Sequence, residues 1–385
     1  MHWQPTSWQD KLCAQAIPYP SLAEVQQVIQ EISLLPALIE VQEIVQLQSQ
    51  LVLAAEGKAF ILQGGDCAER FANASQANHV SNTLNLLSTV ADRLRHGLQK
   101  PIIGIGRLAG QYAKPRTHEY EVQQGISLPA YRGDMINAVE FSAAARIPKP
   151  RLMLQAYQCA KHTLQCLQEF KSIVNEMFYS SHEALLLPYE QALTRCIDGA
   201  WYNLSTHFPW LGMRTAAIEG AHVEYLRGIA NPIAIKIGPW LSSQALLALL
   251  TQLNPQRLPG RITLIHRLGN KKINDTLPGL IEAIQQHHQP VLWMCDPMHG
   301  NTQLTQKGFK TRYIDEILAE VKQAFTIHRR LNSCLSGIHL EFTSEDVNEC
   351  LHSTMAQANG SDKVLIDPRL NAQQALNLAS EISHY

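Results

Sequence analysis

Short apolar runs recur along most of the chain and alternate with longer amphipathic stretches. Between most of the runs, apolar residues recur at the three- and four-residue spacing of a helix. Eight runs have the pattern of buried strands: residues 59–62, 101–105, 201–204, 232–237, 261–265, 290–294, 337–340 and 364–366. Strands that alternate with helices form parallel sheets, and eight repeats close such a sheet into a barrel. The pattern therefore predicts an α/β fold, a (β/α)8 TIM barrel.

Two parts of the chain depart from this alternation. Residues 21–57 carry apolar residues at helical spacing, which predicts two helices ahead of the barrel. The interval 141–200 is too long for one crossover and has a helical pattern, so we expect a helical insertion after the second strand. We therefore divide the chain into an N-terminal helical extension, residues 1–57, and a catalytic barrel, residues 58–385.

Composition narrows the range of partners. The chain has 32 basic and 33 acidic residues, so neither nucleic acid nor an acidic membrane surface is an expected partner. No apolar run approaches the roughly 18 residues of a membrane span, and the first residues lack the features of a signal peptide. We therefore expect a cytoplasmic protein. Its eight scattered cysteines contain no C-x-x-C pair, which favours buried thiols over a disulfide framework or a zinc ribbon.

Ionisable residues gather directly after the apolar runs. The carboxyl ends of barrel strands meet at one mouth, where TIM-barrel enzymes have their active sites. One group of these residues is of metal-ligand type: Cys67, His299, Glu341 and Asp367. A thiolate, an imidazole and two carboxylates suit manganese, iron, cobalt or zinc better than calcium or magnesium. Taken singly, each also has an ordinary structural interpretation as a buried thiol, a loop cap or an ion-pair partner.

A second group at the strand ends is cationic. Its members are Arg107, Lys114, Arg116, Arg214, Lys236 and Arg267. In a chain of near-neutral net charge, such a set is explained more readily by anionic ligands than by a solvent-exposed face, because arginine binds phosphate and carboxylate bidentately. The alternative is an ordinary set of surface salt bridges.

Five segments, in this order, resemble class II 3-deoxy-D-arabino-heptulosonate 7-phosphate (DAHP) synthases. They are QGGDCAE at 63–69, GRLAGQYAKPR at 106–116, YRGDMIN at 131–137, DPMHGNT at 296–302 and DPRLN at 367–371. The resemblance runs from about residue 7 to near the C-terminus. It implies a transferase that condenses phosphoenolpyruvate with erythrose 4-phosphate and water to give DAHP and phosphate, the first step of the shikimate pathway.

The resemblance also implies roles for both groups of residues. It implies one divalent metal ion per subunit, Mn²⁺ or alternatively Co²⁺, Fe²⁺ or Zn²⁺, on the four ligands named above. The expected phosphoenolpyruvate contacts are Arg107, Lys114, Arg214, Lys236 and Arg267. The expected erythrose 4-phosphate contacts are Arg116 and Thr117, and the expected catalytic residues are Lys114, His299 and Arg214.

Two features depart from the family pattern. The family usually has Gly-Glu-Arg-Thr-Arg where this chain has Gly-Met-Arg-Thr-Ala at 212–216, so one carboxylate and one cation near the phosphoenolpyruvate site are missing. The stretch between Leu167 and Ser181 is short where longer members insert a helix pair that helps to bind aromatic amino acids. We therefore expect a compact member with weak or absent feedback inhibition by Phe, Trp and Tyr.

Two other functions are alternatives to DAHP synthesis. A related synthase that uses an aminated or imino aldose phosphate would need the same phosphate-binding residues. A catalytically silent barrel would act instead as a regulatory partner, for example of chorismate mutase. The four ligand residues argue against a silent barrel, and only Met213 and Ala216 favour it. A homo-oligomer acting on small molecules is expected.

Overall fold

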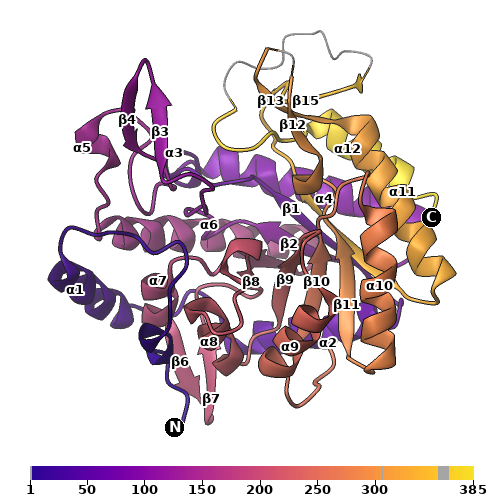
Figure 1. Ribbon diagram of the computed structural model, residues 1–385, viewed down its shortest axis with the longest axis horizontal. Coiled ribbons are helices and arrows are strands. Elements are labelled where there is room, and N and C mark those ends of the chain that lie inside the picture. Colours follow the sequence, from indigo (N-terminus) through magenta and orange to yellow (C-terminus); the bar gives the residue numbers. More distant parts are fainter. Residues whose placement is uncertain (1, 306, 354–363) are drawn as a thin grey trace.

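The computed structural model describes residues 2–305, 307–353 and 364–385, and its centre is an eight-stranded parallel barrel (Figure 1). Seven parallel strand pairs join the eight barrel strands, and the last strand pairs with the first. In order they are β1 (Phe60–Gly65), β2 (Ile102–Arg107), β5 (Phe178–Ser181), β8 (Trp210–Leu211), β9 (Ile233–Ile237), β10 (Ile262–His266), β11 (Val291–Cys295) and β14 (Leu335–Glu341). Between β5 and β8 the barrel is closed by a parallel bridge, Glu183 with Trp210. The backbone amides of Phe208 and Trp210 donate to the carbonyls of Ser180 and His182 and join β8 to β5. The predicted TIM barrel is confirmed.

Six of the eight predicted strands are confirmed and two are wrong. Residues 201–204 belong to β7 (Ala200–Asn203), which pairs antiparallel with β6 (Thr194–Ile197) outside the barrel. Residues 364–366 form no strand. The true barrel strands are β5, which is half polar, and β8, which has two residues. The search for apolar runs missed β5 because half of its residues are polar. Ser181 is buried and its hydroxyl donates to the carbonyl of Gly106, at 2.9 Å, so this strand can be buried without an apolar run.

A helix follows every barrel strand and covers the outside of the barrel. These helices are α4 (Ala77–Leu98), α6 (Leu152–Val174), α7 (Leu187–Ala192), α8 (Ala221–Gly228), α9 (Ser243–Leu253), α10 (Ile273–Gln286), α11 (Ile314–Arg330) and α12 (Ala372–Ile382). Their apolar residues recur along one face; in α11 that face buries Ile317, Val321 and Ala324. No described helix is both long and apolar enough to cross a membrane.

The two helices predicted ahead of the barrel are present as α1 (Leu22–Ser33) and α2 (Val41–Ala55). Helix α2 lies across the amino end of the barrel. Its Leu47 and Leu51 are fully buried and pack with barrel-lining residues such as Met294. Because α2 closes this end, the carboxyl ends of the strands form the open mouth.

The predicted helical insertion is wrong in character. The interval 141–200 is crossed by β5, and after β5 it holds only the short α7 and the β6–β7 hairpin. The extra segment after the second strand is instead a second hairpin, β3 (Tyr120–Gln123) with β4 (Ile126–Pro129), followed by the single turn α5 (Ala143–Arg146). At the tip of the β3–β4 hairpin, Gln124 and Gly125 both have positive φ, as tight two-residue hairpin turns require.

A small sheet lies near the mouth of the barrel. It consists of β12 (Thr302–Leu304), β13 (Lys310–Tyr313) and β15 (Cys350–Leu351). Figure 1 shows this sheet and the β3–β4 hairpin at the same end of the molecule. Both therefore stand where the barrel opens.

Candidate active site

A cavity of about 440 Å³ opens at the carboxyl ends of the barrel strands. Nine of the residues singled out in the sequence line it: Arg107, Lys114, Arg116, Thr117, Arg214, Lys236, Arg267, His299 and Asp367. Glu341 is fully buried directly behind this lining, in contact with Arg107 and His299. Side chains that are as much as 260 positions apart in the chain therefore meet at one place.

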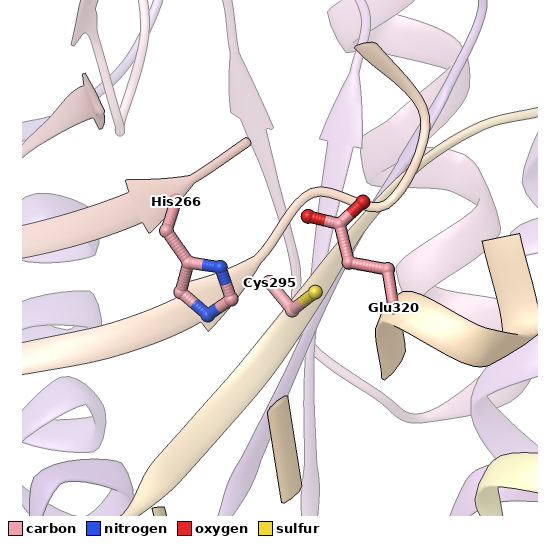
Figure 2. Close-up of side chains that lie close together, drawn as sticks. All are labelled: His266, Cys295 and Glu320. Atoms are coloured by element: carbon pink, nitrogen blue, oxygen red, sulfur yellow. The ribbon is translucent and has the colours of Figure 1, made fainter. Parts of the chain in front are cut away.

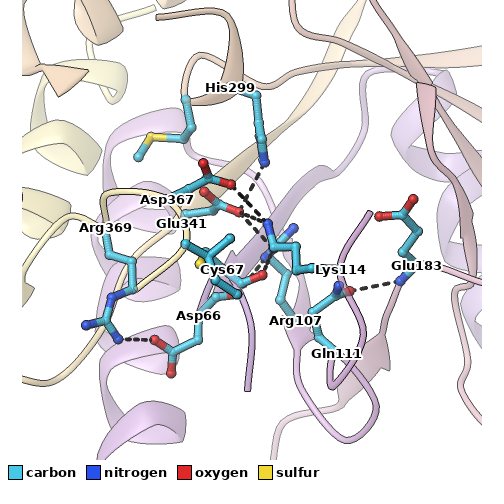
Figure 3. Close-up of polar contacts among 12 residues, drawn as sticks. Asp66, Cys67, Arg107, Gln111, Lys114, Glu183, His299, Glu341, Asp367 and Arg369 are labelled. Atoms are coloured by element: carbon cyan, nitrogen blue, oxygen red, sulfur yellow. Dashed lines mark hydrogen bonds and ion pairs between the residues drawn. The ribbon is translucent and has the colours of Figure 1, made fainter. Parts of the chain in front are cut away.

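Three of the four predicted metal ligands face one another. The ligand atoms of His299, Glu341 and Asp367 all lie within 4.8 Å of one another, and His299 Nε2 is 3.2 Å from Glu341 Oε1 (Figure 3). Cys67 is buried beside them and takes a backbone hydrogen bond from Asp367. Burial raises the pKa of the Cys67 thiol to about 11, against the opposing charge of Lys114. An imidazole and two carboxylates at this separation, with a thiol alongside, fit a transition-metal ion.

Strand register explains why these residues meet. Gly65 of β1 pairs with Glu341 of β14, so the chain that leaves β1 passes the end of β14. Gly65 has φ +142°, and a Cβ there would lie 3.0 Å from the carbonyl oxygen of Arg107. Only glycine permits this close passage, which leads into Asp66 and Cys67. A bridge between Phe342 and Leu370 brings the segment with Asp367 back to the same strand end.

Three cations surround Glu341. Its Oε1 lies 2.9 Å from Arg107 and 3.5 Å from Lys114, and its Oε2 lies 2.7 Å from Nη1 of Arg312. Although burial raises the pKa of Glu341, the charges of His299 and these cations hold it well below its ordinary value. Arg312 was not predicted. It lies on β13 of the small sheet, so a search of barrel strand ends could not find it.

A chain of hydrogen bonds inside the barrel fixes Arg107. Its guanidinium donates to the carbonyls of Asp66 and Cys67, at 2.9 and 3.0 Å, to Glu341 and to Nε2 of His339, at 2.7 Å. Nδ1 of His339 in turn faces Gln63 Oε1 at 2.8 Å. Burial holds the pKa of His339 well below its ordinary value, so the ring is neutral and accepts from Arg107. Four of the five N–H groups of Arg107 are engaged, which leaves one for a ligand.

Asp296 joins two of the predicted residues and was not itself predicted. Its Oδ2 lies 2.5 Å from Lys236 Nζ and 2.8 Å from His299 Nδ1. Because Nδ1 is held in this way, the other ring nitrogen of His299 points at Glu341. Burial lowers the pKa of Lys236 to about 8, although the Asp296 carboxylate opposes the change.

The cations lie at two depths. Arg107, Lys114 and Lys236 are buried, whereas Arg214 is exposed at the rim. There, Arg214 donates to Thr117 Oγ1 at 2.6 Å, so a predicted phosphoenolpyruvate contact adjoins a predicted erythrose 4-phosphate contact.

Arg116 also lies at the rim. It pairs at 2.8 Å with Glu121 of the β3–β4 hairpin, which thereby forms part of the cavity wall. The two predicted groups of anion contacts therefore form one continuous surface, from the buried Lys236 to the exposed rim.

Glu183 and Trp210 also line the cavity and were missed. Among the described residues, Oε1 of Glu183 has no hydrogen-bond partner, and burial raises the pKa of this carboxyl group. The Trp210 ring lies 5.1 Å from the guanidinium of Arg107 and 6.0 Å from Lys236 Nζ. Glu183 follows β5 and Trp210 lies on β8, which are the two strands that the sequence pattern did not predict.

The unusual Met213 is part of the same wall. Its Sδ lies 2.1 Å from the place where a Cβ on Gly238 would stand, so the thioether packs directly on the end of β9. Oε1 of Glu183 lies against the neighbouring Gly212, 1.9 Å from the place where a Cβ on that glycine would stand. One carboxylate therefore remains in this wall although the position of Met213 carries none.

Known proteins resemble this chain over nearly its whole length. The family model described as the class-II DAHP synthetase family matches residues 3–173 and 167–383. A phospho-2-dehydro-3-deoxyheptonate aldolase of Streptomyces coelicolor is 37% identical over 435 positions, which cover 97% of this chain and 95% of the relative. One from Neurospora crassa is 36% identical over 456 positions, which cover 100% and 94%. Both alignments exceed 385 positions, so the relatives carry segments without a counterpart here.

Among solved structures, a phospho-2-dehydro-3-deoxyheptonate aldolase from Francisella tularensis SCHU S4 has a similar fold. Its TM-score is 0.53 at 13% identity, and the match covers 96% of this chain and 98% of the other. At this identity the likeness concerns the fold alone.

Proposed function

The chain belongs to the class II DAHP synthase family and is a DAHP synthase, and we propose that the cavity at the barrel mouth is where it condenses phosphoenolpyruvate with erythrose 4-phosphate. The reaction takes up water and releases phosphate, and its product, DAHP, begins the shikimate pathway. The observation that carries the placement is a continuous cationic wall beside one cluster of an imidazole and two carboxylates. Two anionic substrates and one divalent ion match that arrangement.

The deep cations are assigned to phosphoenolpyruvate. This substrate carries a phosphate and a carboxylate on adjacent carbons, so it needs several cations held close together. Lys236 and Arg267 line the cavity, as do Arg107 and Lys114, which contact Glu341. Hydrogen bonds within the protein position Arg107 and Lys236 before a ligand arrives, so little reorganisation is needed on binding.

The rim is assigned to the phosphate of erythrose 4-phosphate. Arg116 and Thr117 both line the cavity there. The adjoining Arg214, which donates to Thr117 Oγ1, is proposed as a phosphoenolpyruvate contact and as a catalytic residue beside Lys114 and His299. A phosphate held at the rim leaves the four-carbon chain free to extend inward, toward His299 and Glu341. Glu121, which pairs with Arg116, keeps this guanidinium on the wall.

Cys67, His299, Glu341 and Asp367 are proposed to hold one divalent ion per subunit, Mn²⁺ first, with Co²⁺, Fe²⁺ and Zn²⁺ as alternatives. An ion bound there supplies a Lewis acid for the aldehyde carbonyl. The protein residues around it have separate tasks. Asp296 orients His299, and Arg312 and Arg107 hold Glu341.

Lys114 and Glu183 are the groups placed to manage charge during the reaction. Lys114 Nζ lies 3.5 Å from Glu341 and 3.3 Å from Asp367. The charge of Glu341 raises the pKa of Lys114 although burial opposes it, so it stays an ammonium ion that can donate a proton. When C3 of phosphoenolpyruvate attacks the aldehyde, positive charge develops at C2. The Glu183 carboxylate, with one oxygen unpartnered among the described residues, is placed to balance that charge and to orient the attacking water.

The test is consumption of phosphoenolpyruvate, followed by its ultraviolet absorbance, with Mn²⁺ and erythrose 4-phosphate. We expect loss of activity on treatment with EDTA and recovery with added Mn²⁺. Cys67→Ser should lower both activity and Mn²⁺ affinity, whereas Cys159→Ser, at a buried thiol of α6, should change neither. Consumption only with an aminated aldose phosphate would support the first alternative, and no consumption with any aldose phosphate would support a silent barrel.

A further inference from the structure

A second cluster of metal-ligand side chains lies behind the active site, on the outer face of the barrel. It consists of His266, Cys295 and Glu320 (Figure 2). His266 is the last residue of β10 and Cys295 the last residue of β11, and the two are register partners. Glu320 projects toward them from α11. We call these three side chains the outer cluster.

The outer cluster is compact and sealed from solvent. One ligand atom from each residue lies within 4.8 Å of the others, and all three residues are 0% exposed. Around a tetrahedral zinc ion, neighbouring sulfur, nitrogen and oxygen ligands stand ~3.5 Å apart. Small side-chain rotations would therefore bring the three atoms to coordination distance.

His266 is the observation that points to a ligand. Among the residues that the structure describes, neither of its ring nitrogens has a hydrogen-bond partner. A neutral imidazole carries one donor and one acceptor, and buried groups of this kind are nearly always satisfied. The neighbouring imidazole, His328, stacks at 6.0 Å and also has an unpartnered Nε2, while its Nδ1 meets Ser333 Oγ at 2.9 Å.

Glu320 is held as a metal-binding carboxylate usually is. Its Oε1 accepts from the backbone amides of Leu268 and Gly269, at 3.1 and 2.9 Å, and its Oε2 accepts from Asn301 at 2.8 Å. Such contacts from surrounding groups fix the orientation of a ligand. The two amides occupy both lone pairs of Oε1, and Oε2, which accepts one hydrogen bond, keeps a lone pair for an ion.

The charge of the outer cluster also fits a divalent cation. Within the described part of the chain, neither Lys nor Arg forms an ion pair with Glu320. A thiolate, a carboxylate and a neutral imidazole carry two negative charges, which a divalent ion would neutralise. Without an ion, burial raises the pKa of Glu320 to about 8 and that of Cys295 well above its ordinary value, so the groups would be largely protonated.

We propose that His266, Cys295 and Glu320 form a second, structural site for a transition-metal ion of the Zn²⁺ type, separate from the ion expected at the barrel mouth. Mixed nitrogen, sulfur and oxygen ligands select zinc-like ions over magnesium or calcium. The imidazole of His328, whose ring centroid lies 6.0 Å from that of His266, is the ligand we assign to the fourth position. The ion would tie β10, β11 and α11 together immediately behind Arg267 and Asp296, which directly follow the two strands.

The test uses Cys67→Ser protein, because the thiol at the barrel mouth would otherwise give the same signal. After chelation, the protein is titrated with Co²⁺, and the near-ultraviolet charge-transfer absorption of a cobalt–thiolate bond is recorded. We expect one equivalent of this signal in Cys67→Ser and in Cys67→Ser/Cys159→Ser, and its loss in Cys67→Ser/Cys295→Ser. Absence of the signal in folded Cys67→Ser, or its persistence without Cys295, would overturn the proposal.

A second variant covers the case in which replacing Cys295 prevents folding. In the same background, Glu320→Gln keeps an acceptor for the amides of Leu268 and Gly269 but removes the charge. We expect the affinity for Co²⁺, read from the same absorption, to fall by at least ~10-fold. An unchanged affinity would contradict the assignment. Neither readout depends on condensation activity.

Discussion

Strands β10 and β11 end by placing neighbouring residues on opposite faces of the barrel. Arg267 lines the cavity and Asp296 contacts Lys236 and His299, which also line it. His266 and Cys295 instead lie on the side of α11. On the inner face, Asp296 is held by Lys236 and His299, and these charges keep its pKa well below the ordinary value in spite of burial. On the outer face, burial instead lowers the pKa of His266 to about 3.

The difference shows two ways in which one sheet buries ionisable groups. Inside the barrel, opposite charges compensate one another, and the resulting fixed array can receive anionic substrates without reorganisation. Outside, no positively charged side chain within the described residues pairs with Glu320 or Cys295, so the members of the cluster are either neutral or bound to an added cation. Four experiments can separate these cases, taken here from the largest expected effect to the smallest.

The paired charges inside the barrel mouth are called the inner array. Replacing Glu341 should cause the largest loss of stability and activity in this array. Glu341→Gln leaves Arg107 and Arg312, both nearly or fully buried, without their carboxylate. Breaking a buried ion pair on one side costs ~3–5 kcal/mol of unfolding free energy. We also expect kcat/KM to fall by ~10³-fold, since a predicted metal ligand is lost. Urea unfolding and steady-state kinetics measure the two effects.

Glu345→Gln is the matched control, because the Glu345 side chain is 41% exposed and pairs with Arg369. Its loss should cost less than ~1 kcal/mol. If both substitutions lowered the free energy of unfolding equally, the buried ion pairs of Glu341 would not be what stabilises the inner array.

Asp296→Asn should disturb the inner array less, by ~10²-fold in kcat/KM for phosphoenolpyruvate. In the wild-type enzyme the pKa of Lys236 is lowered to about 8, so its positive charge, and with it the affinity for phosphoenolpyruvate, is lost as pH rises through about 8. The Asp296 charge raises that pKa. Without this charge, KM for phosphoenolpyruvate should begin to rise at a lower pH. If the pH dependence of KM were unchanged, Asp296 would have only a structural role.

Zinc binding at the outer cluster should stabilise the folded protein. In Cys67→Ser protein, Zn²⁺ at 100 times its Kd should add ~2.7 kcal/mol to the free energy of unfolding, because it binds only the folded outer cluster. Cys67→Ser/Cys295→Ser should gain much less, and Cys67→Ser/Cys159→Ser should respond like the parent. Thermal unfolding with and without Zn²⁺ measures the gain. Equal stabilisation of all three proteins would locate the zinc effect elsewhere.

The sequence predicted much of the inner array because strand ends converge in any closed parallel barrel. Arg107 and Arg267 follow apolar runs and Lys236 lies at the end of one, which was enough to predict that all three meet at one mouth. Glu183 escaped because the half-polar β5 was not recognised as a strand. Arg312 escaped because it reaches Glu341 from a sheet outside the barrel.

The outer cluster escaped for a different reason. His266 and Cys295 are the last residues of correctly predicted strands, but alternation along a strand turns them away from the cavity. Their third partner, Glu320, lies on a helix and resembles any other residue of an amphipathic pattern. Such a site depends on how a helix packs against a sheet, which the spacing of residues in one chain does not specify.

The smallest effect is expected at a third place, the connection between α6 and β5 at the amino end of the barrel. Helix α6 ends at Val174 and β5 begins at Phe178, so no helix pair intervenes at the position where the resemblance implies an aromatic-amino-acid site in longer members. Saturating Phe, Trp or Tyr should therefore change condensation activity by less than ~2-fold, since an effector without a site cannot favour one state of the enzyme. Activity assays with each amino acid, alone and combined, measure this. A several-fold loss of activity would contradict this expectation.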